Sequence, residues 1–259
     1  MMKSSRKWQV LSIVLPIAFG VLLVLLAQFE VIHHLFGLKT AQLPLPSSII
    51  SMFFDKFGKL VQDAWYTVSS ALAGLLLGSL IGFAAASLST MFPKIFYGSQ
   101  TIMVAINSIS IIALAPIMNR WFSDSWQAKT AVVTIACMGA MSVTAFKGLN
   151  SLQPFSLDLM RSYASGKRNV FFKLRLPNSI PYVFVGLRVN VASAMVSSII
   201  SEFFATETSG LGYLIKNSLK MGNQKVLGWA YILAAALVSL MIYAIVSLIE
   251  KRATEWYAS

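Results

Sequence analysis

The chain has 259 residues, of which 57% are hydrophobic and only 12% are charged, and its mean hydropathy is +0.72. Soluble domains carry about 25% charged residues, so this composition excludes water as the main solvent of the chain. The formal net charge of +12 does not indicate a nucleic-acid partner, because the basic residues lie between apolar segments and not on one polar face. The sequence therefore predicts a multi-pass protein of the cell membrane.

Six segments are apolar enough to cross a bilayer, which takes about 20 mainly apolar residues. Their approximate ranges are 10–29, 64–89, 96–118, 128–149, 181–203 and 227–249. The first segment is interpreted as a retained helix, because it is long enough to span and no small-residue cleavage site follows it. After it, the amphipathic stretch 47–60 is predicted to lie along the outer membrane interface.

The distribution of Lys and Arg indicates the orientation, because cytoplasmic loops carry an excess of both. The richest loop precedes the fifth span and holds Arg161, Lys167, Arg168, Lys173 and Arg175. Several basic residues of the opposite side, such as Lys39, are offset by Glu30, Asp55, Asp63, Asp124 and Glu207. Both termini are therefore predicted inside, as is Lys3.

The second span carries small residues at steps of four: Ser70, Gly74, Gly78, Gly82 and Ala86. At this spacing they form one stripe along a helix, where the backbone of another helix can approach closely. The stripe favours packing against a helix of the same chain, and a subunit interface is the alternative.

The chain shows no motif of an enzyme. Ser165 to Arg168 imitate the end of a phosphate-binding loop, but Arg161 stands at its earlier glycine and Arg168 replaces its Ser or Thr. His33 and His34 are adjacent and cannot converge on one metal ion from a helix. The single Cys137 excludes an intrachain disulfide. We therefore expect no catalytic residue, no metal and no cofactor in this chain.

The fifth span carries a polar stripe, in which Asn190, Ser193, Ser197 and Ser201 follow at steps of three and four and Glu202 comes next. Polar groups in hydrocarbon need partners, so the stripe is predicted to line a pathway together with Asn107 and Ser110 of the third span. The alternative is that the serines bond to carbonyls of their own helix.

The basic loop before this span is predicted to form two short helices, with Gly166 breaking or bending the chain between them and Pro177 and Pro181 resetting the backbone. Its apolar residues, including Leu159 and Tyr163, favour insertion into the groove of a partner. A solvated loop that touches anionic lipid is the alternative.

This loop resembles the cytoplasmic signature of ABC-importer permeases, which has an acidic residue, two alanines, a glycine and a closing Leu-Pro. Asp158 stands at the acidic position, Leu159 and Met160 at the alanines, Ala164 at the glycine, and Leu176 and Pro177 at the closing pair. The resemblance extends over roughly 60–252 and is to the sulfonate, taurine, nitrate and vitamin-precursor branch. It rests on Ile112–Pro116, on Trp121 and Phe122 (with Ser123 in place of a glycine), on 177–188, Glu202–Phe204 and Ser209–Ile215, and on Glu250–Arg252 with Trp256.

The resemblance implies an all-α membrane protein of six transmembrane helices with the type I importer fold and both termini inside. It implies one permease domain over 1–259, in which 1–60 is the N-terminal helix and external segment, 61–252 the core and 150–180 the cytoplasmic coupling loop. It also implies a second permease subunit, in our interpretation a homodimer, an ABC ATPase dimer that binds ATP and Mg²⁺, and an extracytoplasmic binding protein.

Site residues follow from these implied roles. The ATPase-coupling set is Asp158, Arg161, Tyr163, Ala164, Ser165, Gly166, Lys167 and Arg168. The outer segment 205–225, with Gly210, Gly212 and Lys216, is expected to contact the binding protein. Flavin, a pyrimidine or thiamine precursor, or a sulfonate all fit as solute. The alternative function is a stand-alone secondary transporter or channel, which would show inverted repeats or several intramembrane charges.

Overall fold

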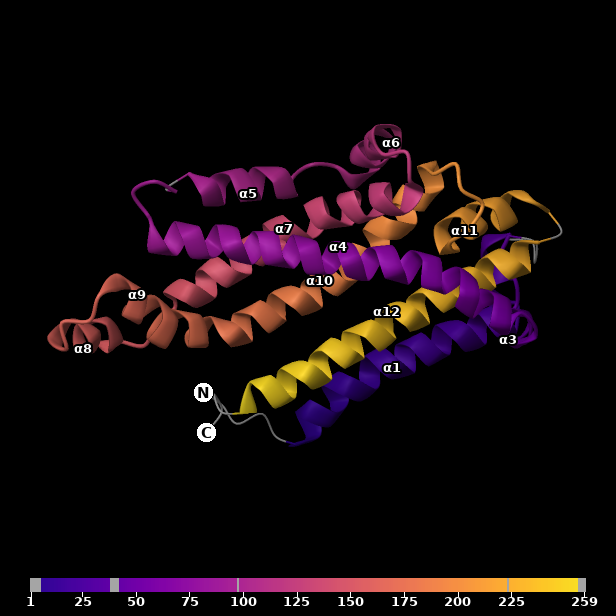
Figure 1. The fold of residues 1–259 in the computed structure, drawn as a ribbon. Coiled ribbons are helices and arrows are strands. Elements are labelled where there is room, and N and C mark those ends of the chain that lie inside the picture. The colour runs from indigo at the N-terminus through magenta and orange to yellow at the C-terminus, as the bar shows by residue number, and fades with distance from the viewer. Residues whose placement is uncertain (1–5, 38–41, 97, 223, 256–259) are drawn as a thin grey trace. The chain divides into compact units, whose positions relative to one another are not determined.

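The computed structural model describes residues 6–37, 42–96, 98–222 and 224–255, and within α1 it leaves out the side chains of 6–13 and 17. Lys3, Lys39 and Trp256, used above, lie outside the described residues. Throughout the described ranges the regular structure is helical (Figure 1). The elements are α1 (Arg6–Gln28), α2 (Val31–Phe36), α3 (Pro46–Asp55), α4 (Phe57–Met91), α5 (Ser99–Asn107), α6 (Ile111–Trp121), α7 (Ser125–Asn150), α8 (Ser156–Ser162), α9 (Lys167–Val170), the π-helix η1 (Phe171–Arg175), α10 (Leu176–Phe204), α11 (Leu211–Lys220) and α12 (Lys225–Ala253).

The chain divides into two compact units, one formed by 1–58 with 215–233 and the other by 59–214 with 234–259. In the first unit, the Gln28 side chain accepts a hydrogen bond from the Ser47 amide at 3.0 Å and joins α1 to α3. The predicted interfacial stretch 47–60 is interrupted at Lys56, where α3 ends and α4 begins. The second unit contains every candidate site residue except Lys216.

Four helices are long and apolar enough to cross a membrane: α4, α7, α12 and the helix Lys167–Phe204. The predicted third span is a pair, α5 and α6, whose axes are bent by 94°, which makes up to five spans. Ser108 and Ser110 lie at this break. The Ser108 hydroxyl competes for a backbone group, because its Oγ donates to the Val104 carbonyl at 3.1 Å. The predicted first span lies in α1, of which Val14–Gln28 is apolar but shorter than the other four. In the part of the chain that the structure describes, the helices therefore do not form six continuous spans.

The fifth predicted span begins earlier than 181, because α9, η1 and α10 follow one another without a break. The prediction that Pro177 and Pro181 reset the backbone is wrong. Pro177 lies in the first turn of α10, where its missing N–H costs little, and Pro181 lies inside the helix. Just before them the Leu176 amide donates to the Phe171 carbonyl, a π-type bond, which shows how the backbone adjusts near the prolines.

The small-residue stripe of α4 packs against α7 in the same chain, which confirms the interpretation favoured above. A Cβ added at Gly74 would lie 2.6 Å from Val133 Cγ1, and one at Gly78 would lie 2.9 Å from Cys137 Cβ. At Gly82 it would meet the carbonyl of Met138. The two helices are therefore in backbone contact along this stripe.

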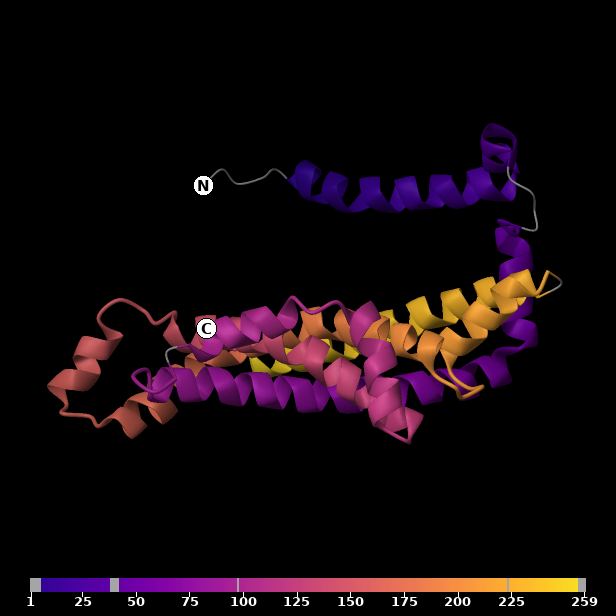
Figure 2. The same cartoon turned by 90° about the horizontal axis from the view of Figure 1, so that it is seen from above.

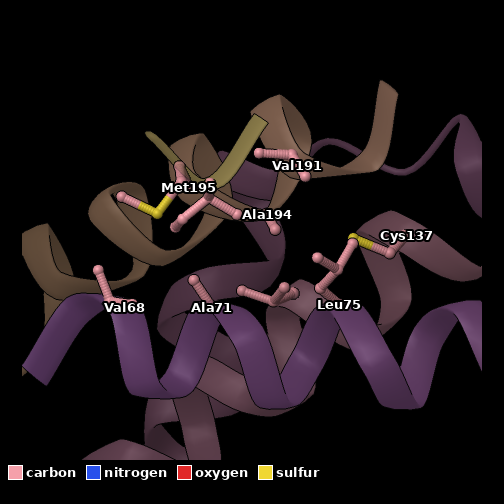
Figure 3. Packing of buried hydrophobic residues seen from close by; sticks show 9 residues of the cluster. Val68, Ala71, Leu75, Cys137, Val191, Ala194 and Met195 are labelled. Atoms are coloured by element: carbon pink, nitrogen blue, oxygen red, sulfur yellow. The ribbon is translucent and has the colours of Figure 1, made fainter. Parts of the chain in front are cut away.

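The core of the second unit lies between α4, α7 and α10. Figure 3 shows one cluster, in which Val68, Ala71 and Leu75 of α4 face Val191, Ala194 and Met195 of α10, with Cys137 of α7 beside them. Figures 1 and 2 show that these long helices run side by side and that α8 and α9 project beyond one end of them. The fold thus separates a projecting loop at one end of α10 from Glu202 at the other.

Candidate functional site

The coupling loop is built on α8, whose end is a Schellman motif. The Ala164 amide donates to the Arg161 carbonyl at 2.8 Å, and the Ser165 amide donates to the Met160 carbonyl at 3.0 Å. Ala164 has a φ of +52°, the left-handed conformation that glycine adopts most easily. The position of the signature glycine therefore makes the bend although it holds alanine. Gly166 lies at the predicted break between α8 and α9, where it is extended (φ −65°, ψ 160°), and the left-handed turn itself is made at Ala164.

One face of α8 and its flanks is apolar and exposed. Phe155, Leu159 and Tyr163 follow at steps of four, so they lie on one side of the helix, and they are 82%, 59% and 76% exposed. Asp158 and Arg161 form an exposed ion pair at 3.1 Å. The remaining predicted coupling residues are exposed except for the half-buried Ser165, and they are Ala164, Gly166, Lys167 and Arg168. Sequence reasoning missed Phe155, although its spacing to Leu159 is visible in the sequence.

The base of this loop is held by polar side chains that bond the last carbonyls of α7. Asn178 Nδ2 donates to the carbonyls of Gly148 at 2.8 Å and Ser151 at 3.0 Å. Arg175 Nη1 donates to Asn150 Oδ1 at 2.6 Å and to the Leu149 carbonyl at 3.1 Å. Helix ends leave such carbonyls without helical partners, and a cation is favourable there. The loop is therefore fixed at its base to α7 and α10.

The predicted pathway residues fall into a buried group and an accessible group. Asn190, Ser197, Ser201 and Glu202 are fully buried within the chain. Asn190 Nδ2 donates to the Cys137 carbonyl at 2.9 Å, and Ser197 Oγ donates to the Ser193 carbonyl at 2.6 Å. Within the single chain, Ser197 and Glu202 find partners on their own helix or on other helices, whereas Asn190 Oδ1 is buried without a hydrogen-bond partner among the described residues. The role of these four residues in a pathway stays a prediction.

The other three predicted pathway residues are accessible. Asn107 and Ser110 are exposed at the break between α5 and α6, and Ser193 is half-buried. Asn107 and Ser193 line a cavity of about 100 Å³ together with apolar residues such as Leu114 and Ile135. A polar pair in an otherwise apolar cavity is the part of the predicted stripe that a solute could reach.

At the end of α10 opposite the α8 loop, Glu202 is surrounded by hydrogen-bond donors that the sequence did not predict to lie together. Lys129 Nζ lies 3.4 Å from Glu202 Oε1, Thr67 Oγ1 donates to the same carboxylate at 2.9 Å, and the Gly212 amide donates to Oε2 at 2.7 Å. Lys129 is a charged residue inside an apolar segment, and that was the available signal. No sequence feature marked Thr67 as part of this site.

The three residues expected to contact a binding protein differ in placement. Gly210 and Gly212 are buried, and a Cβ on either would meet Glu202 or its neighbourhood. They shape the loop between α10 and α11, and the contact of this segment with a binding protein stays a prediction. Lys216 belongs to the first compact unit. Among the described residues, no group of three His, Cys, Asp or Glu gathers as a metal site.

Comparison with known proteins matches residues 74–255 to the family described as binding-protein-dependent transport system inner membrane component. The chain is 25% identical to the formylaminopyrimidine transport permease protein of Halalkalibacterium halodurans, over 90% of this chain and 93% of that protein. It is 22% identical to the taurine transport system permease protein of Escherichia coli, over 97% and 94%. In fold it is similar to the MetNI methionine ABC transporter in an inward-facing conformation, with a TM-score of 0.65 and 16% identity, over 77% of this chain and 98% of that one.

Proposed function

Because the chain belongs to the family of binding-protein-dependent transport system inner membrane components, we propose that it is the permease subunit of an ABC importer for a small organic solute. It is a membrane protein of the ABC permease class. In the proposal, an extracytoplasmic binding protein delivers the solute and a separate ATPase dimer, docked on the α8 loop, supplies the energy.

The observation that carries the proposal is the exposed apolar face of Phe155, Leu159 and Tyr163. The helix α8, which carries this face, projects beyond the long helices (Figures 1 and 2). In the proposal it lies outside the hydrocarbon, which then does not explain three exposed apolar side chains. A short helix with an apolar face suits a hydrophobic groove on a partner. Arg161, Lys167 and Arg168 would form a basic rim around it. The loop's attachment to α7 and α10 through Asn178 and Arg175 supports the transmission of a movement of the docked helix to the spans.

A second permease subunit completes the proposed pathway. Asn107, Ser110 and Ser193 lie at the surface or at a cavity of about 100 Å³, which is smaller than the 300–1,000 Å³ typical of ligand pockets. We therefore place the solute between this surface and the facing surface of another permease, identical or paralogous. Rocking of the two against each other would alternate access from the two sides.

The solute belongs to a small organic class. The named relatives carry formylaminopyrimidine in one case and taurine in another, at similar identity. Both are compatible with hydroxyl and amide groups at the pathway surface. The proposal therefore includes pyrimidine or thiamine precursors, flavins and sulfonates. Calorimetric screening of these compounds against the partner binding protein would select among them.

The decisive test substitutes Tyr163 on the apolar face of α8. In the Tyr163→Asp variant, a charge would have to enter the hydrophobic groove, so we expect loss of the co-purifying ATPase and of ATP-driven uptake. The Tyr163→Phe variant keeps the ring and should retain both. Membrane insertion, measured by the yield of folded chain, should stay equal in the two variants.

Two outcomes would contradict the proposal. Normal ATPase recovery and uptake with Tyr163→Asp would exclude α8 as the docking element. Uptake by the purified chain without any ATPase would instead support a stand-alone secondary transporter. Replacing Arg161, Lys167 and Arg168 by Glu tests the rim in the same assay, with weaker ATPase association as the expected result.

A further inference from the structure

The outer end of the second unit contains a buried polar cluster, here named the Glu202 cluster: Thr67, Lys129, Glu202, Leu211 and Gly212. Glu202 is 0% and Lys129 1% exposed. Thr67 Oγ1 donates to both carboxylate oxygens, at 2.9 Å and 3.0 Å, and accepts from the Leu211 amide at 2.9 Å. The Gly212 amide donates to Glu202 Oε2 at 2.7 Å. One carboxylate thus joins α4, α7 and α10 to the first residues of α11.

The cluster contacts the loop 205–210 at both of its ends. The loop leaves α10 after Phe204, and the Ala205 amide donates to the Glu202 carbonyl at 3.3 Å. It returns at Gly210, whose φ of +100° brings the backbone so close that any Cβ would meet the Glu202 carboxylate. Within the loop, Glu207 is 41% exposed and its Oε2 lies 3.9 Å from Lys129 Nζ. Lys129 therefore lies between a buried carboxylate and one at the surface.

A buried ion pair is a weak source of stability, because the cost of removing two charges from water offsets most of their attraction. Apolar residues of the same size would pack these helices equally well, so stability alone does not account for the cluster. Its geometry has a specific effect that apolar packing lacks: it fixes the first two amides of α11, where the loop ends, and one loop carboxylate in a single arrangement.

We propose that Thr67, Lys129 and Glu202 are positioning residues that hold the loop 205–210 as a preformed docking surface for the solute-loaded binding protein. This inference rests on the proposed function, because it assumes that a binding protein docks at this end. A rigid loop loses little conformational freedom on docking, which favours association. Because α4, α7 and α10 share the carboxylate, docking at the loop acts on all three helices together.

The test compares Thr67→Val with Thr67→Ser in the full assembly reconstituted in lipid nanodiscs. Valine keeps the shape but removes the hydroxyl, whereas serine keeps it. Hydrogen exchange at the Leu211 and Gly212 amides is read first, and it does not depend on transport. We expect about tenfold faster exchange at Leu211 in Thr67→Val, the factor that follows from losing one buried hydrogen bond. Thr67→Ser should exchange as the unmodified protein does.

The second measurement is ATPase stimulation by the binding protein that crosslinks to the assembly in native membranes. In Thr67→Val the half-saturating concentration of that protein should rise by about tenfold while the maximal rate is retained, because only loop order is lost. A purely structural role would lower the yield or the maximal rate and leave half-saturation unchanged. Lys129→Met serves as the second variant and should show the same shift, since Glu202 then loses its only cation among the described residues.

The outcomes separate the two proposals. Unchanged exchange at Leu211 in Thr67→Val overturns the positioning role. Faster exchange with unchanged half-saturation overturns it as well, because the order of the loop would then have no effect on docking. If the unmodified assembly is not stimulated by any binding protein, the proposed function itself fails, and the docking role falls with it whatever the exchange shows.

Discussion

Ala164 is the residue at which the coupling loop departs from the signature it resembles, and its backbone explains how the departure is tolerated. Its φ of +52° is left-handed, and both hydrogen bonds of the Schellman motif are present. For an L-residue other than glycine this conformation costs about 1–2 kcal/mol. The two bonds and the chain's return toward α9 hold the residue there, so alanine gives the same bend at a cost in stability.

We predict that Ala164→Gly stabilises the loop by about 0.5–1 kcal/mol. Glycine removes the left-handed penalty, and part of the gain is offset by about 0.5–1 kcal/mol of additional chain entropy. Hydrogen exchange at the Ala164 and Ser165 amides should therefore slow by about two- to fivefold. Ala164→Val is the matched control and should accelerate exchange, because a branched side chain is strained at positive φ. Equal exchange in all three proteins would contradict the strain assignment.

For single residues, the sequence predicted which polar side chains are important better than it predicted the partners that they bond. The polar stripe of α10 was visible from its spacing, but spacing cannot say which neighbour supplies the partners. Asn190 bonds the Cys137 carbonyl, a backbone atom that no side-chain pattern reveals. Lys129 was visible as a charge in an apolar run, whereas its pairing with Glu202 joins residues 73 positions apart. Thr67 could not have been found, since threonine is ordinary at a helix surface.

Among the elements, the contact of α4 with α7 is the one that the sequence predicted most directly. Small residues at steps of four can only serve close approach, and Gly74, Gly78 and Gly82 each meet α7. Breaks inside helices were harder to predict. An apolar composition throughout predicts one helix for the third span, whereas the structure bends by 94° between α5 and α6, beside the bond of Ser108 Oγ to the Val104 carbonyl. Prolines were read as ends because that is their usual effect outside membranes.

We predict that Gly82→Ala destabilises the second unit by about 1–3 kcal/mol, the range for inserting a group into a packed core. The new Cβ would meet the Met138 carbonyl and lie 2.9 Å from the Ser142 amide nitrogen, so the backbones of α4 and α7 would have to separate. Gly58→Ala, also in α4, is the control because a Cβ there has nothing within 4 Å. Unfolding in detergent followed by circular dichroism measures both. A Gly82→Ala protein as stable as Gly58→Ala would contradict close packing of the two helices.

For the whole molecule, the burial of some predicted pathway residues and the accessibility of others decide where a pathway can run. Asn190 and Ser197 are enclosed between α10 and its neighbours, whereas Asn107 and Ser193 line a cavity. A rocking movement of one permease against another would change the exposure of the second pair first, since they already lie at an accessible surface. The buried pair would be reached only if helices within one chain separated.

Cysteine labelling distinguishes these two arrangements in the intact membrane. Single cysteines at positions 107 and 193 should react with a membrane-impermeant maleimide, and those at 190 and 197 should not, because only the first two side chains are accessible. Cys137→Ala provides the background, and its removal should change little in labelling because Cys137 is 0% exposed. If none of the four positions reacts, this surface is not part of an aqueous pathway. If the protein with Asn190→Cys reacts as fast as the one with Ser193→Cys, α7 and α10 separate during transport and the pathway passes between them.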